Sequence, residues 1–316
     1  MLVVGAGSVV IAEPASAREG LAWAQSAALT GVDWRQRTSP KAPPGGFEPG
    51  LVYDSVNNQT IAFGGGWTNQ TWSWNGRKWS KLHPSTRPAV RRDFGMAYDP
   101  VRDETVLYGG WDGDGQVLGS TWVFKNGQWS QRSPAKSAGD LAYQQMAYDP
   151  TRQQIIMFGG IRDIGDWNES TWAWDGKTWT ELAPTHSPAA RAKAAFAYDP
   201  LRDALVMFGG EGRDDYYDET WVWNGTDWFQ PVLKNKPPAL IDVAGATFNA
   251  HLAIFGGERL DQTTSADTWI LGRDSWRLLD VNPAPSARSG ANMAWDPVQQ
   301  EDVLLGPGPD TWTLHR

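Results

Sequence analysis

The sequence contains no cysteine in its 316 residues. That absence excludes disulfide bonds, thiolate metal sites and thiol nucleophiles together, so the stability of the fold must come from packing. Histidine is scarce as well, and none of the four histidines has a neighbour at the spacing that metal ligands show. We therefore expect no metal site and no cofactor. The four histidines are His83, His186, His251 and His315.

Positive charge is in deficit. The chain has 28 lysine and arginine residues against 36 aspartate and glutamate residues, which gives a formal net charge of −8 at pH 7. No stretch rich in lysine or arginine stands out against this background. An acidic chain of this kind repels a phosphate backbone, so we exclude nucleic acid as a partner.

Long hydrophobic runs are missing too. An apolar stretch covers residues 2–12 and is too short to cross a bilayer as a helix. It is followed by Ala15-Ser16-Ala17, which has the small-x-small form of a secretory cleavage site, although no basic residue precedes Arg18. We expect a signal peptide over residues 1–17, a linker over residues 18–29, and a secreted, periplasmic or extracellular protein without a membrane span.

Glycine, proline and tryptophan are abundant, with 34, 21 and 20 residues. Glycine and proline interrupt strands and aromatic residues favour pleated surfaces, so this composition predicts an all-β protein with many turns. An internal repeat supports that prediction, because a Tyr-Asp pair or a relative of it recurs every 45 to 50 residues. The six pairs are Tyr53-Asp54, Tyr98-Asp99, Tyr148-Asp149, Tyr198-Asp199, Phe248-Asn249 and Trp295-Asp296.

Each repeat continues in the same order. A turn and an apolar run lead to a glycine pair, where the missing Cβ atoms allow close backbone approach. A variable loop, a Thr-Trp pair and a second tryptophan follow, and Asn-Gly or Asp-Gly between the two tryptophans in four repeats predicts a tight hairpin. Each repeat therefore predicts four antiparallel strands, a to d. The glycine pairs begin at Gly64, Gly109, Gly159, Gly209 and Gly256, and the Thr-Trp pairs at Thr71, Thr121, Thr171, Thr220, Thr268 and Thr311.

One four-stranded unit cannot bury both of its faces, so such units stack around an axis as the blades of a propeller. The glycine pair, the aromatic residue after the b–c loop and the tryptophan of strand d resemble the kelch-repeat family over residues 34–316. The resemblance implies an all-β, six-bladed kelch-type β-propeller with four antiparallel strands in each blade. We expect this domain to occupy residues 30–316.

The ring needs a strand from elsewhere in the chain. The sixth repeat ends at Arg316, just after strand c, and has no strand d of its own. Residues 34–40 (Trp-Arg-Gln-Arg-Thr-Ser-Pro) look like the d segment at residues 129–134 (Trp-Ser-Gln-Arg-Ser-Pro). We therefore expect an N-terminal strand to complete the last blade, which leaves no exposed sheet edge at the seam.

The kelch resemblance also raises the question of copper chemistry. The family includes copper oxidases whose cofactor needs a Tyr–Cys crosslink and two histidine ligands. This chain has no cysteine, so we exclude that reaction.

A position that recurs in equivalent places belongs to the scaffold more often than to a site. Arg102, Arg152 and Arg202 each lie three residues after the aspartate of their repeat, in the a–b turn. We expect them to pair locally with Asp99, Asp149 and Asp199 and to have a structural role.

Residues that do not recur are better candidates for a binding site. The b–c loops carry aromatic residues outside the repeat pattern together with many charged residues. In a four-stranded blade the b–c and d–a loops emerge on one face, which is therefore the expected binding face. The candidates from the b–c loops are Trp67, Trp111, Trp167, Tyr216, Glu211 and Glu258.

Three arginines of the d–a loops complete the set of candidates. Arg91, Arg191 and Arg288 each lie in a Pro-x-x-Arg segment, seven residues before the aromatic residue of strand a. The family resemblance implies that arginines of these loops face a ligand pocket at the channel mouth and bind acidic groups. The alternative is that each arginine caps a neighbouring blade. From alternate blades, the three would surround one mouth and converge on an anionic group.

We expect a non-catalytic recognition module that binds a carbohydrate or a protein segment through its b–c/d–a face, because aromatic platforms beside charged groups suit both ligands. One alternative is a glycan-active enzyme that resembles the kelch sialic acid mutarotases, with Glu211 or Glu258 transferring protons. A second alternative is a structural surface protein. We expect a monomer.

Overall fold

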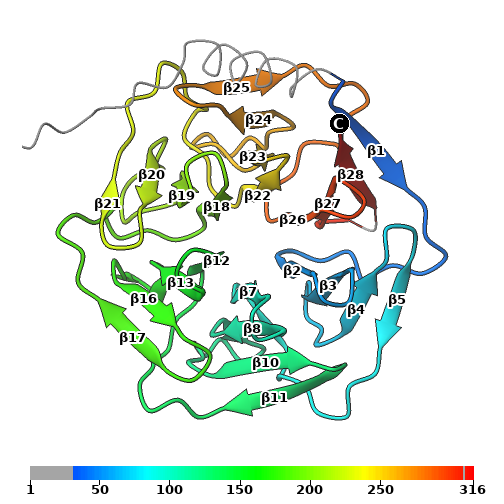
Figure 1. Ribbon diagram of the computed structural model, residues 1–316, viewed down its shortest axis with the longest axis vertical. Coiled ribbons are helices and arrows are strands. Elements are labelled where there is room, and N and C mark those ends of the chain that lie inside the picture. The colour runs from blue at the N-terminus through cyan, green and yellow to red at the C-terminus, as the bar shows by residue number, and fades with distance from the viewer. Residues whose placement is uncertain (1–30, 309) are drawn as a thin grey trace, which may run out of the picture.

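Six four-stranded antiparallel sheets form a ring in the computed structural model (Figure 1). Two pockets lined by the first strands of the blades lie at the centre of the ring, which we call the channel. The structure describes residues 31–308 and 310–316, and these ranges contain no helix. The predicted six-bladed β-propeller is therefore confirmed. Over the same ranges no helical segment is long and apolar enough to cross a membrane. The predicted signal peptide and linker, residues 1–29, lie outside the described residues.

The first three blades follow one another along the chain, with strand a beside the channel and strand d at the rim (Figure 1). Blade 1 contains β2 (Pro49–Asp54), β3 (Gln59–Gly64), β4 (Thr71–Trp74) and β5 (Trp79–Leu82). Blade 2 contains β7 (Gly95–Asp99), β8 (Glu104–Tyr108), β10 (Thr121–Lys125) and β11 (Gln128–Arg132). Blade 3 contains β12 (Gln145–Asp149), β13 (Gln154–Phe158), β16 (Thr171–Trp174) and β17 (Trp179–Leu182).

The remaining strands form the other three blades and two small ribbons. Blade 4 contains β18 (Ala195–Asp199), β19 (Ala204–Phe208), β20 (Thr220–Trp223) and β21 (Trp228–Phe229). Blade 5 contains β22 (Ala244–Phe248), β23 (His251–Phe255), β24 (Thr268–Leu271) and β25 (Trp276–Leu279). Blade 6 contains β26 (Asn292–Asp296), β27 (Glu301–Leu305), β28 (Thr311–His315) and β1 (Asp33–Arg37). The ribbons pair β6 (Arg91–Arg92) with β9 (Trp111–Asp112), and β14 (Ile161–Asp163) with β15 (Asp166–Trp167).

The N-terminal strand closes the ring, as predicted. Strand β1 lies antiparallel to β28, with Trp34 opposite Leu314, and Figure 1 shows the blue strand against the red one. Arg37 of β1 also donates to the Thr313 hydroxyl at 2.7 Å and forms an ion pair with the buried carboxylate of Glu301 at 2.5 Å. The seam is therefore held by a sheet ladder and by buried polar contacts.

A ring of tryptophan–threonine hydrogen bonds joins all six blades. In each blade the buried tryptophan of strand d donates its indole N–H to the threonine hydroxyl that begins strand c of the preceding blade. These six distances lie between 2.8 and 3.0 Å. The contact explains why Thr-Trp recurs in every repeat, because a buried indole N–H needs an acceptor. The pairs are Trp34–Thr268, Trp79–Thr311, Trp129–Thr71, Trp179–Thr121, Trp228–Thr171 and Trp276–Thr220.

The glycine pairs lie where the d–a loop of the next blade crosses the end of strand b. Gly110 donates its N–H to the carbonyl of Leu141 at 2.9 Å. A Cβ atom on Gly109 would approach the same carbonyl oxygen to 2.1 Å, and both glycines have positive φ angles. The predicted close backbone approach is therefore confirmed, and it explains why glycine is required.

Blade 5 departs from the predicted alignment by one residue. Its a–b turn contains only Asn249 and Ala250, whose φ angles of 46° and 69° fit a type I′ turn, whereas the other turns are longer. In the strand register Phe248 pairs with His251, so Thr247 occupies the place that the tyrosine holds in blades 1 to 4. The alignment of Phe248-Asn249 with the Tyr-Asp pairs was wrong because the turn is shorter.

The arginines of the a–b turns have the predicted structural role. Arg102, Arg152 and Arg202 form ion pairs with the aspartate three residues earlier, at distances between 2.6 and 3.1 Å. Each also donates to a backbone carbonyl of the following blade. These arginines therefore tie neighbouring blades together on the a–b side.

Candidate functional site

The b–c and d–a loops of each blade meet on the same face of the ring, as predicted. In blade 2 the d–a loop pairs with the b–c loop through β6 and β9. The same contact recurs in blades 3, 4 and 5 as isolated bridges, Ala142–Ile161, Ala192–Glu211 and Ile241–Glu258. The d–a residues therefore border the channel opening, and the b–c loops surround them.

Six equivalent residues, one from the d–a loop of each blade, form a collar around this opening. Backbone N–H groups of the collar donate to the carbonyl of the collar residue in the preceding blade, through five hydrogen bonds of 2.7 to 3.3 Å. The collar therefore links the d–a loops of neighbouring blades around the channel. Its residues are Glu48, Asp93, Tyr143, Lys193, Asp242 and Gly290.

All six collar residues have left-handed backbone conformations. Their φ angles run from 49° to 69°. Glutamate, tyrosine and lysine rarely adopt this conformation, in contrast to the aspartate and glycine that complete the collar. Such strain persists only where the surrounding structure imposes it, and it gathers at functional sites. The scaffold thus holds six residues of five different types in equivalent left-handed positions around one opening.

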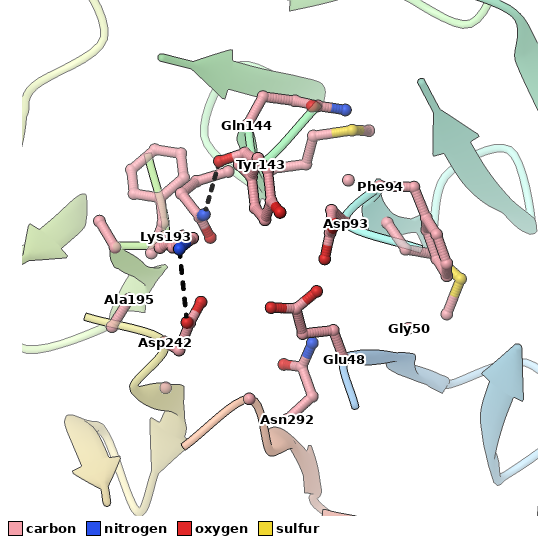
Figure 2. A pocket seen from close by; sticks show the side chains of 18 of the residues that line it. Glu48, Gly50, Asp93, Phe94, Tyr143, Gln144, Lys193, Ala195, Asp242 and Asn292 are labelled. Atoms are coloured by element: carbon pink, nitrogen blue, oxygen red, sulfur yellow. Dashed lines mark hydrogen bonds and ion pairs between the residues drawn. The ribbon is translucent and has the colours of Figure 1, made fainter. Parts of the chain in front are cut away.

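The collar surrounds a cavity of about 120 Å³. Figure 2 shows the carboxylates of Glu48 and Asp93, from neighbouring blades, pointing toward one another, with Asp242 beside Lys193. The amides of Gln144 and Asn292 also line it, and the lining includes apolar side chains of the a strands, such as Phe196 of β18. The cavity is therefore lined by polar, mainly acidic groups together with apolar side chains.

Lys193 is held between two carboxylates. Its ammonium group lies 2.8 Å from Glu211 and 3.8 Å from Asp242, and 5.0 Å from the centre of the Tyr143 ring. Burial alone would lower the pKa of Lys193, but the charges of Asp242 and Glu211 outweigh burial and raise it. Lys193 is therefore a fixed cation whose charge these carboxylates already neutralise.

Asp93 is buried without a hydrogen-bond partner. Its side chain is fully covered, and neither carboxylate oxygen accepts a hydrogen bond. The guanidinium of Arg92 lies 3.4 Å from one oxygen, and that arginine is 42% exposed. Burial raises the pKa of Asp93 to about 7. The Tyr143 hydroxyl is near enough to favour the charged form but does not reach hydrogen-bond geometry.

Other titratable groups of the collar are shifted as well. Burial raises the pKa of Asp242 to about 6, and the charge of Lys193 opposes that shift. Burial and the charge of Asp93 raise the pKa of Tyr143 to about 12, so its hydroxyl stays protonated. Perturbed groups that gather in one concave site are typical of functional sites. The collar is therefore the candidate site of this protein.

The three predicted arginines do not line this cavity. Arg91, Arg191 and Arg288 are buried, and each donates to groups of its own blade. Arg91 bonds the carbonyl of Gly109, Arg191 bonds the carbonyl of Gly209 and the Glu219 carboxylate, and Arg288 bonds both oxygens of Asp310. These contacts hold the b–c loop to the d–a loop, and ligand binding by the three arginines stays an untested prediction.

Arg92 connects two of the predicted aromatic residues to the collar. The Arg92 guanidinium stacks 5.1 Å from the centre of the exposed Trp67 ring, and Arg92 pairs with Trp111 in the β6–β9 ribbon. Because Arg92 also contacts Asp93, the two tryptophans are connected to the acidic side of the opening. The structure therefore places Trp67 and Trp111, two of the predicted aromatic residues, beside the mouth.

The other predicted residues lie on the far side of the opening. Glu211 contacts Lys193 and pairs with Tyr216, whose hydroxyl lies 3.5 Å from Glu258. Trp167 borders a separate hollow of about 360 Å³ between the b–c loops of blades 3 and 4. Arg213, Asp166 and Tyr217 also line this hollow. The predicted b–c residues therefore flank the collar on two sides.

Sequence reasoning missed the side chains of the collar itself. Asp93 and Lys193 lie two residues after the predicted Arg91 and Arg191. The signal was present, because this position carries a different residue in almost every repeat and directly precedes the regular pattern of strand a. The collar position was not predicted because the prediction relied on the arginines two residues earlier, which recur in three repeats.

Comparison with protein-family models finds no match, and comparison with curated proteins finds no match either. The kelch-type assignment is compatible with the six four-stranded blades and stays a resemblance. Within residues 31–308 and 310–316, no group of three or more histidine, aspartate or glutamate side chains is arranged to hold a metal ion.

Proposed function

We propose that this protein is a non-catalytic recognition module that binds its ligand on the b–c/d–a face, over the collar. A carbohydrate or an extended segment of another protein is the class of ligand that this face suits. The observation that carries the proposal is the collar itself, in which a strained, hydrogen-bonded backbone presents different side chains around one cavity.

The surroundings of the collar support a ligand larger than the cavity. Trp67 is exposed beside it, and the hollow at Trp167 adds a second aromatic surface with charged neighbours. Aromatic rings next to charged groups bind both sugar rings and peptide side chains. A ligand anchored at the collar could therefore extend over the b–c loops.

Glycan and peptide arrays are the experiment that identifies the ligand, and hydrogen exchange with the best binder then locates it. We expect protection from exchange in segments 91–94 and 141–145 of the d–a loops and in the b–c loop at residues 161–168. Segments 55–58 and 100–103, in the a–b turns of the opposite face, serve as the internal control. Protection confined to the a–b turns would refute the proposal.

A glycan-active enzyme is the second candidate. The observation that favours it is the pair of carboxyl groups, Asp93 and Asp242, whose pKa values burial raises toward neutrality inside one cavity. Any glycan found on the array should be incubated with the protein and followed for turnover. Turnover that Asp93→Asn abolishes without loss of binding would make this the better description.

We also propose that the protein is exported. The support is the apolar stretch before Ala15-Ser16-Ala17 in the sequence. N-terminal sequencing of protein from the culture medium should find a mature chain that begins near Arg18, whereas an intact Met1 in the cytosolic fraction would refute export.

A further inference from the structure

The hydrogen-bonding groups of the collar cavity are unbalanced. Its amide side chains already donate to backbone carbonyls, and its ammonium group is engaged by carboxylates. The donor distances of the amides run from 2.8 to 3.1 Å. Each amide therefore keeps one N–H beyond these contacts, and the ammonium group is already engaged by carboxylates, so few donors are left for a ligand. The amide contacts are Gln144 with Tyr108, Gln145 with Tyr143, and Asn292 with Pro49.

Acceptors, in contrast, are left open. Both carboxylate oxygens of Asp93 and the side-chain oxygen of Gln144 are buried without a hydrogen-bond partner. The orientation of the Gln144 amide is fixed, because its N–H donates to a carbonyl that could not face the amide oxygen instead. A buried acceptor without a donor costs free energy, so a ligand or a water molecule that donates to these oxygens would stabilise the site.

The charge of the cavity points in the same direction. Three carboxylates line it, from Glu48, Asp93 and Asp242, against the single ammonium group of Lys193. Glu211 adds a further negative charge to that lysine. Among the described residues, Arg92 is the cation that forms an ion pair with Asp93, and it is partly exposed. An anionic ligand would meet like charges and few donors there.

We propose that the collar cavity binds an organic ammonium group, either on a free alkylamine or on a lysine side chain. An ammonium group carries three donors and no acceptor, which complements the open oxygens of Asp93 and Gln144. Its positive charge offsets the excess of carboxylates, and charge-assisted hydrogen bonds of this kind are strong. This inference rests on the function proposed above and specifies the chemistry of its ligand.

The first test compares probes that differ only in the charged group. Binding of n-butylammonium and of 1-butanol should be measured by calorimetry or by NMR titration. Nα-acetyl-lysine amide and its Nε-acetylated form give the same contrast for a lysine side chain. We expect the ammonium compounds to bind at least about tenfold more tightly than their neutral counterparts. Tighter binding of the lysine compound than of butylammonium would identify a protein segment as the source, and equal binding a free amine.

Two variants should move the affinity for butylammonium in opposite directions. Asp93→Asn keeps the shape and tolerates the left-handed backbone but removes the charge, so we expect at least about tenfold weaker binding. Arg92→Met removes the cation that competes for Asp93, so above pH 8, where Asp93 is ionised, we expect several-fold tighter binding. Asp114→Asn replaces an exposed carboxylate in the b–c loop of blade 2, on the same face but outside the cavity, so it is the matched control and should change little. Thermal unfolding of each variant checks that it is folded.

The pH gives an independent readout. Asp93 is surrounded by Arg92 on its own loop and by Glu48, Tyr143, Lys193 and Asp242 of the other blades. With a pKa of about 7, Asp93 is about one-tenth ionised at pH 6 and about nine-tenths ionised at pH 8. An alkylammonium group stays charged throughout, so its affinity should rise by close to tenfold over this range.

Three results would overturn this inference: no binding of butylammonium to the wild-type protein, equal binding of 1-butanol, or equal effects of Asp93→Asn and Asp114→Asn. The first would indicate that the open oxygens hold only water. If hydrogen exchange placed a neutral or anionic ligand over the collar, this inference would fail while the proposed function stood. Protection on the opposite face would refute the proposed function itself.

Discussion

Replacing Trp34 with alanine tests whether the N-terminal strand closes the ring as one of six equivalent d strands. The indole of Trp34 is 1% exposed, donates to Thr268 at 2.9 Å and packs at 5.1 Å against Phe255 of the neighbouring blade. Removing a buried tryptophan side chain costs about 3 to 5 kcal/mol of stability, and the lost hydrogen bond is part of that figure. We expect a loss of about 4 kcal/mol.

Trp129 of blade 2 provides the matched comparison. Its indole makes the same contacts, with Thr71 at 2.9 Å and with Phe63 at 5.0 Å, but its strand lies within the continuous chain. Urea unfolding gives the free energy of unfolding of each variant, and the two values are compared with the same dependence on urea concentration. We expect the two losses to agree within about 1 kcal/mol.

One result would contradict closure of the ring by β1. If Trp34→Ala lost less than about 1 kcal/mol while Trp129→Ala lost about 4, strand β1 would be an appendage and the sixth blade would stand on three strands. Thr268→Val adds a smaller perturbation of the same bond, because it leaves the indole N–H of Trp34 buried without an acceptor. That substitution should cost about 1 to 3 kcal/mol.

Three further predictions concern other parts of the molecule. Gly109→Ala should destabilise the protein by at least about 2 kcal/mol more than Gly127→Ala in thermal or urea unfolding, since both have positive φ but only the first would meet a carbonyl oxygen; equal losses would contradict the crossing-loop explanation. Asp302 is fully buried, and burial raises the pKa of its carboxyl group. Above about pH 4 this carboxyl group therefore ionises in the unfolded chain but stays protonated in the folded protein, so its contribution to wild-type stability should fall as pH rises. The melting temperature of Asp302→Asn should therefore exceed that of the wild type by a margin that grows from pH 4 to pH 7, and a constant margin would refute this reasoning. With added copper and galactose, release of hydrogen peroxide should not exceed the metal-free control, and turnover would overturn the exclusion drawn from the missing cysteine.

The architecture could be predicted because propeller packing imposes the same demands on every blade. The glycine pairs recur because a neighbouring loop crosses them, and the threonines recur because each accepts an indole N–H across a blade interface. The missing strand d of the last repeat also predicted that a strand near Trp34 would take its place. These features are dictated by packing, so they leave a periodic trace in the sequence.

The features that were not predicted correctly from the sequence depend on local geometry. The shortened a–b turn of blade 5 shifts the register by one residue, and an alignment by residue type pairs Phe248 with the wrong position. The small ribbons β6–β9 and β14–β15 in the loops have no repeat signal at all. Such features are set by loop length and by contacts with neighbouring loops.

The sequence pointed to the b–c/d–a face but not to the collar. Glu211, Tyr216 and Glu258, which were predicted as candidates on this face, lie beside the collar, and ligand binding by them stays a prediction. Arg191, by contrast, repeats an arginine of two other blades and bonds within its own blade. Lys193, two residues later, does not repeat, and it faces the cavity. A residue that does not recur among the repeats was the better indicator of the site, and the arginines do recur.

The most direct test of the central claim is a crystal structure of the protein with the ligand that the arrays identify. The account predicts the ligand over the collar on the b–c/d–a face, in contact with Asp93 or Gln144. A ligand bound instead at the opposite end of the channel, among Tyr98, Tyr148 and Tyr198 of the a–b side, would contradict it.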